Sequence, residues 1–140
     1  MNSEDEIKKL NKEVKKIKEK MESLDNQVRH LKNLELRKDP KRAVDFISQS
    51  INKSEIRAEI LLYCFDKKRL QKEIGDYLGI DRRNIYNYLE HLLRFDMLEV
   101  LGVEKRSRIF RTTIHDKNLL KTAIKESLDP KIAKKLLDKY

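Results

Sequence analysis

Apolar residues recur with a seven-residue period in the first part of the chain. Within residues 4–36, those from Ile7 to Leu31 are spaced alternately by three and four positions, and most residues between them are charged. The series is Ile7, Leu10, Val14, Ile17, Met21, Leu24, Val28 and Leu31. A helix with so narrow an apolar stripe cannot bury it alone, and four heptads are typical of a coiled coil. The pattern therefore predicts a dimerisation helix over residues 4–38.

The residue types along this stripe favour two parallel strands. β-Branched residues predominate at the a positions and Leu at the d positions, a combination that favours parallel dimers. In a parallel pair, Glu13 faces Lys18 and Lys20 faces Asp25 of the partner helix, so the flanking charges are complementary. The alternative is a long amphipathic helix that packs on its own domain. We expect the homodimer.

A second region follows Asp39-Pro40, because proline disfavours helical geometry in the preceding residue. The apolar spacing predicts a short helix over residues 41–52. Ser54 is a suitable N-cap for another helix over residues 55–65. The positions expected to face inward are Val44, Ile47, Ile51, Ile56, Ile60, Leu61 and Cys64.

Residues 71–92 carry the most informative pattern. Gly79 lies where a tight turn between two helices requires a positive φ, and Asp81 can cap the second helix. Gly75 lies where the two helices would approach most closely. The apolar positions of the pair are Ile74, Leu78, Ile80, Ile85, Leu89 and Leu92. This layout resembles the helix-turn-helix of DNA-binding proteins, and an ordinary αα-hairpin is the alternative.

Two short strands are predicted next, joined by a polar tip at residues 104–107 in which two of the four residues are basic. Residues 109–113 form the second strand, and the first carries Met97, Leu98, Val100 and Val103. Helices, helix-turn-helix and hairpin in this order resemble the winged helix-turn-helix family, close to the small regulators of archaea and bacteria. The resemblance covers about residues 54–114. Asp96 stands where many members carry glycine, and Asp tolerates left-handed geometry better than most residues.

Residues 117–140 contain two more segments in which apolar residues recur at helical spacing, separated at Asp129-Pro130. They predict two short amphipathic helices, with Leu119, Leu120, Ile124, Ile132, Leu136 and Leu137 on their apolar faces. These helices would cover the preceding domain, add to the dimer contact or bind another protein. The predicted fold class is mainly α: a parallel two-stranded coiled coil, a winged helix-turn-helix domain at 41–116 with a small β-hairpin wing, and short C-terminal helices.

The second helix of the motif carries polar side chains at its N-terminal end that packing does not use. Arg can bond guanine and Asn adenine through paired hydrogen bonds, and the helix N-terminus itself favours a phosphate. The contacts expected from this helix are Arg82, Arg83, Asn84, Tyr86 and Asn87. The contacts expected with flanking backbone are Lys105, Arg106, Arg108 and Arg111 of the wing, with Lys67 and Lys68 ahead of the motif. The alternative is a solvated basic face.

Composition agrees with a polyanionic partner. Lys and Arg number 33 against 24 Asp and Glu, which gives a formal charge of +9. The N-terminal segment lacks the apolar region of a signal peptide, and no apolar run is long enough to span a bilayer. We therefore expect a cytoplasmic, nucleoid-associated protein. Cys64 is the single cysteine and the three histidines are scattered, so we expect no metal, no cofactor and no enzymatic activity.

Together these patterns predict a homodimer that binds double-stranded DNA sequence-specifically and regulates transcription. The helix from Asp81 would enter the major groove, and the wing at 104–108 would contact the flanking backbone. Two alternatives stay open. One is an architectural or partition-type protein that binds DNA with little sequence preference. The other is a winged-helix adaptor for protein contact, with the coil or the C-terminal helices as the surface that binds its partner.

Overall fold

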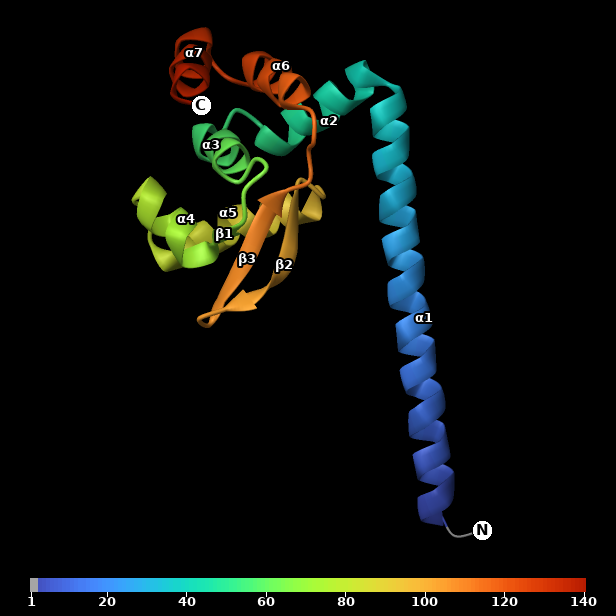
Figure 1. The fold of residues 1–140 in the computed structure, drawn as a ribbon. Helices are drawn as coiled ribbons and strands as arrows, with labels where there is room; N and C mark the ends of the chain where they lie inside the picture. The colour runs from blue at the N-terminus through green and yellow to red at the C-terminus, as the bar shows by residue number, and fades with distance from the viewer. Residues whose placement is uncertain (1–2) are drawn as a thin grey trace. The chain divides into compact units, whose positions relative to one another are not determined.

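The computed structural model describes the backbone of residues 3–140 and the side chains of residues 3–22, 24 and 39–140. Helices make up 68% of it, and three strands form a small antiparallel sheet (Figure 1). The expected mainly α class is thus confirmed. The chain divides between Asp39 and Pro40 into two compact units.

The first unit is built on one helix, α1, from Ser3 to Lys38. Acidic residues occupy its first turn, where the positive end of the helix dipole favours them. The described residues of the apolar stripe are 49–60% exposed in the single chain: Ile7, Leu10, Val14, Ile17, Met21 and Leu24. The side chains of Val28 and Leu31 lie outside the described residues. The described part of the stripe is therefore uncovered in one chain.

The second unit, residues 40–140, surrounds one hydrophobic core. It begins with α2 (Pro40–Ile51) and α3 (Glu55–Tyr63). The hydroxyl of Ser54 accepts a hydrogen bond from the Arg57 amide at 3.3 Å, so the predicted N-cap is confirmed. Of the positions expected inside, Val44, Ile47, Ile51, Ile60, Leu61 and Cys64 are buried and Ile56 is half-buried.

Two short helices follow, α4 (Gln71–Leu78) and α5 (Arg82–Arg94). Gly79 ends α4 with φ +66°, and the Asp81 carboxylate accepts a hydrogen bond from the Asn84 amide at 3.3 Å. Gly75 is buried at the crossing, where a Cβ atom would lie 3.3 Å from the Ile80 carbonyl oxygen. The left-handed turn, the cap and the close approach all match the sequence prediction.

The sheet has the strand order β1-β3-β2. Its strands are β1 (Arg69–Leu70), β2 (Leu98–Glu104) and β3 (Ser107–Thr112), all antiparallel. Asp96, just ahead of β2, has the left-handed φ of +56° that its residue type tolerates. The hairpin of β2 and β3 was predicted, whereas β1 was not. Two residues are too few to show the period of a strand.

The C-terminal helices α6 (Lys117–Ser127) and α7 (Pro130–Lys139) complete the second unit. α6 packs against α2, and the side chains of Asp116 and Asp129 cap the two helices. Leu120, Ile124 and Leu136 are buried in the common core, and Leu119, Ile132 and Leu137 are half-buried. The structure thus places residues 117–140 in the same compact unit as residues 40–116.

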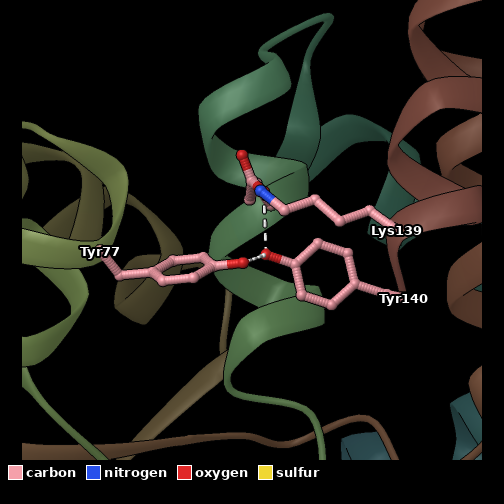
Figure 2. Close-up of polar contacts among 4 residues, drawn as sticks. Tyr77, Lys139 and Tyr140 are labelled. Atoms are coloured by element: carbon pink, nitrogen blue, oxygen red, sulfur yellow. Dashed lines mark hydrogen bonds and ion pairs between the residues drawn. The ribbon is translucent and has the colours of Figure 1, made fainter.

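A polar network joins the end of α7 to α3 and α4 (Figure 2). The Tyr140 hydroxyl donates to the Glu59 carboxylate at 2.8 Å and hydrogen-bonds the Tyr77 hydroxyl at 2.9 Å. Burial, followed by these two hydrogen bonds, raises the pKa of Tyr140. The Lys139 ammonium also lies 2.8 Å from the Glu59 carboxylate, and the Tyr77 ring stacks on Tyr63. Tyr77 thus connects α4 to the C-terminal end of the chain.

Cys64 gives the stability of the core a predictable pH dependence. Burial raises the pKa of its thiol from 9.0 to about 12. A raised pKa stabilises the fold fully below the unfolded value, and this contribution is lost as pH rises through the folded value. We expect Cys64→Ala to lower the free energy of unfolding by about 1–2 kcal/mol near neutral pH. The difference in this free energy between the parent and the variant should narrow above about pH 9. Urea unfolding across that range measures the difference, and a difference independent of pH would contradict this role of the thiol.

Candidate nucleic-acid interface

A groove of about 1080 Å³ lies between α4, the N-terminal end of α5 and the tip of the β2–β3 hairpin. Of the described residues that line the groove, six carry basic side chains and one, Asp76, carries a carboxylate. The basic residues are Lys72, Arg82, Arg83, Lys105, Arg106 and Arg108. These six residues and the space between them are called the basic groove. The positive charge of its lining favours an anionic ligand.

The start of α5 forms one wall of the basic groove. Ile85, Leu89 and Leu92 are buried, which turns the polar residues of the helix outward. Arg82, Arg83, Asn84, Tyr86 and Asn87 are all exposed, as predicted. Arg82, Arg83 and Tyr86 line the groove, while Asn84 and Asn87 lie outside its lining.

The hairpin tip forms the facing wall with a two-residue turn. Its residues, Lys105 and Arg106, have φ values of +51° and +62°. Hairpin turns with two positive φ values favour Asn-Gly, and a side chain such as Lys or Arg costs about 1–2 kcal/mol in that geometry. Both side chains are exposed and line the groove. Strain of this kind concentrates at functional sites.

Arg108, which was expected to contact DNA, is held within the protein. Its Nη1 atom lies 2.8 Å from a Glu90 carboxylate oxygen on α5, and its Nε atom lies 3.1 Å from the Gln71 side-chain oxygen on α4. Its side chain is 28% exposed. Arg111, also expected in the interface, pairs with Glu99 across the hairpin at 2.9 Å. The two arginines therefore have protein partners that their sequence positions did not indicate.

The two lysines expected ahead of the motif lie away from the groove lining. Lys67 and Lys68 are exposed in the turn before β1. Because β1 runs antiparallel to β3, this turn lies toward the end of β3 that is far from the hairpin tip. Lys72 does line the groove, and its amide donates to the Ser107 hydroxyl at 3.2 Å. Lys72 was not among the contacts expected from the sequence, where its one signal is its place in the first turn of α4.

His91 lies outside the groove lining. His91 is half-buried, and its Nε2 atom lies 3.1 Å from the Ser50 carbonyl oxygen. Burial, followed by the charge of Arg57, lowers the pKa of His91. Over the described residues, no three His, Cys, Asp or Glu side chains gather in a way that could hold a metal ion. The helices of this described part include none with the length and apolar character needed to cross a membrane.

Comparisons of the chain with models of protein families, with curated proteins and with solved structures found no match.

Proposed function

We propose that the protein is a homodimeric, sequence-specific binder of double-stranded DNA that regulates transcription without enzymatic activity. The basic groove is the observation that supports this most. Duplex DNA carries one negative charge per about 1.7 Å of its axis, and affinity for it comes largely from Lys and Arg on phosphates. Arg108 is the one of the six that is paired with a carboxylate among the described side chains, and the other five project from α5, α4 and the hairpin tip.

We propose that the second unit is a winged helix-turn-helix domain with α5 as its recognition helix. Helices of this kind contact base edges with residues near their N-terminal end. Arg82 and Arg83 occupy that end, and Asn84 and Asn87 are exposed beside them. Arginine and asparagine are the side chains best suited to guanine and adenine in the major groove. The hairpin would then act as the wing and hold the flanking backbone through Lys105 and Arg106.

We propose that two chains associate through α1 as a parallel coiled coil. The support is the exposed apolar stripe, which a second copy of the same helix would cover along its described length. At 1.5 Å per residue, the 36 residues of α1 extend about 54 Å. A two-fold dimer carries two recognition helices, so its natural target is an inverted repeat.

The runner-up is DNA binding with little sequence preference. It is favoured by the same groove, because each of the five basic residues other than Arg108 can contact a phosphate as well as a base. A sequence-neutral protein would bind all duplexes alike, mainly by counterion release. Competition between a selected duplex and mixed genomic DNA separates the two proposals.

Fluorescence anisotropy with a labelled duplex at several salt concentrations tests DNA binding itself. Five free cations per chain give an expected log–log salt slope of about −4 to −5 for each chain bound. Binding at about 0.05 M salt that weakens with this slope would support the basic groove as the interface. A chain that fails to bind duplex DNA even at this salt would refute the proposal.

The strained tip provides a second test. Replacing Lys105-Arg106 by Asn-Gly puts residues that favour positive φ at both positions of the turn, so we expect the midpoint temperature of unfolding to rise by several degrees. The same change removes two cations, so DNA affinity should fall about tenfold or more, with a salt slope smaller by about 2 per chain. Stability and binding thus move in opposite directions.

Lys53→Gly is the matched control for the tip. Lys53 has the same left-handed geometry, with φ +62°, and lies outside the groove lining. This variant should gain stability and keep its DNA affinity. A tip variant that binds DNA as well as the parent would exclude the hairpin from the interface.

A further inference from the structure

We infer that Arg108 is a positioning residue, which fixes the hairpin against α5 and α4 and makes no contact with DNA. This inference rests on the proposed function, since positioning matters only if the two walls of the groove act together on one ligand. Arg108 lies in β3, two residues beyond the turn formed by Lys105 and Arg106, and its side chain reaches from the hairpin to both helices.

The contacts of Arg108 determine its orientation. One edge of the guanidinium donates to Glu90 and another to Gln71, on two different helices. The guanidinium carbon also lies 5.0 Å from the ring centroid of Phe110 and 5.3 Å from that of Tyr86. A planar guanidinium with two hydrogen bonds and two aromatic contacts has little rotational freedom. A lysine ammonium cannot make the same combination of contacts. Arg108 therefore joins three elements at one point.

The electrostatics of Arg108 argue against a phosphate contact. Its charge is compensated by Glu90, and the two side chains are only 28% and 30% exposed. Its remaining nitrogen, Nη2, is buried inside the fold. Presenting this guanidinium to a phosphate would require breaking the Glu90 pair and leaving a partly buried carboxylate without a partner.

The place of Glu90 on α5 determines which part of that helix the Arg108–Glu90 pair holds against the hairpin. Glu90 follows Tyr86 by one helical turn, on the side of α5 that faces the hairpin. The pair thus fixes the hairpin beside the same stretch of α5 that begins with Arg82 and Arg83. Lys105 and Arg106 lie at the end of that hairpin. The spacing between the two groups of cations is then determined by Arg108 and Glu90.

A thermodynamic cycle with Arg108→Met, Glu90→Gln and the double variant tests this inference against DNA contact. For a positioning pair, each single variant should weaken DNA binding about tenfold with an unchanged salt slope, and the double variant should be no weaker than either single one. For a phosphate contact, Arg108→Met would reduce the salt slope by about 0.9, and Glu90→Gln would strengthen binding by removing a negative charge. The opposite signs expected for Glu90→Gln decide between the two roles.

Arg111→Met is the matched control. It breaks the Arg111–Glu99 pair on the same hairpin, outside the groove lining, and should leave DNA affinity unchanged. Thermal unfolding of every variant confirms that the chain is folded at the temperature of the binding assay.

A measurement without DNA separates failure of this inference from failure of the proposed function. Spin labels on Asn87→Cys and Glu104→Cys, both exposed sites, report the distance between α5 and the hairpin. Cys64 is buried and should not take up label. With labelled chains diluted in an excess of unlabelled chain, so that one chain of a dimer carries labels, we expect one narrow distance distribution in the parent and a broader one with Arg108→Met. Equal widths would overturn the positioning role, whatever the protein binds.

Discussion

The double variant Arg82→Ala/Arg83→Ala should bind duplex DNA about 100-fold or more weakly than the parent. Its midpoint temperature of unfolding should stay within a few degrees of that of the parent. Both arginines are exposed at the start of α5, and the packing of that helix uses Ile85 and Leu89 instead. A well-formed base or phosphate contact by each arginine contributes about 1–3 kcal/mol, so the loss of two is large. Fluorescence anisotropy and circular dichroism measure the two quantities.

Arg94→Ala is the matched control for this variant. Arg94 is exposed in the last turn of the same helix and lies outside the basic groove. Its replacement should leave DNA affinity nearly unchanged. Parent-like binding by the double variant would remove the N-terminal end of α5 from the interface and with it the proposed recognition helix.

Ile17→Glu should convert the dimer to a monomer, with a rise of at least about 100-fold in the dimer dissociation constant. Ile17 occupies a d position and is 58% exposed in the single chain. In a parallel coil, the substitution sets two carboxylates against each other in the seam without compensating partners. Sedimentation equilibrium over a range of protein concentrations measures the change, and the monomer should bind an inverted repeat as weakly as a single half-site.

Lys16→Glu is the control that shows whether the loss of the dimer in Ile17→Glu comes from the change in the apolar stripe or from the added negative charge alone. Lys16 is the neighbouring residue, exposed at a c position on the outside of the proposed coil. We expect it to leave the dimer intact. A parent chain that sediments as a monomer at micromolar concentration would contradict association through α1.

Features set by short-range geometry could be predicted from the sequence. Gly79 and Asp81 define the turn between α4 and α5 because a positive φ and a helix cap each depend on one or two residues. The heptad spacing predicted α1 equally well, since a single period extends through it. The exposure of the α5 polar residues followed from the burial of every third or fourth neighbour.

Features that depend on distant partners could not be predicted in this way. Arg108 resembles the other wing cations in the sequence, yet Glu90 and Gln71 hold it from 18 and 37 positions away. Lys72 joins the groove because Ser107, 35 positions on, bonds its amide. The strand β1 exists only by pairing with β3. Which cations converge is thus a property of the tertiary fold, whereas the presence of a basic surface is visible in the sequence.

Selection of genomic fragments by the purified protein at about 0.15 M salt, followed by sequencing, tests the central claim most directly. A sequence-specific dimer should enrich an inverted repeat whose half-sites lie about one helical turn, or a multiple of it, apart. The enrichment should disappear in Arg82→Ala/Arg83→Ala and persist in Arg94→Ala. Fragments recovered without a common sequence would contradict specific recognition, and the recovery of no fragments would contradict DNA binding altogether.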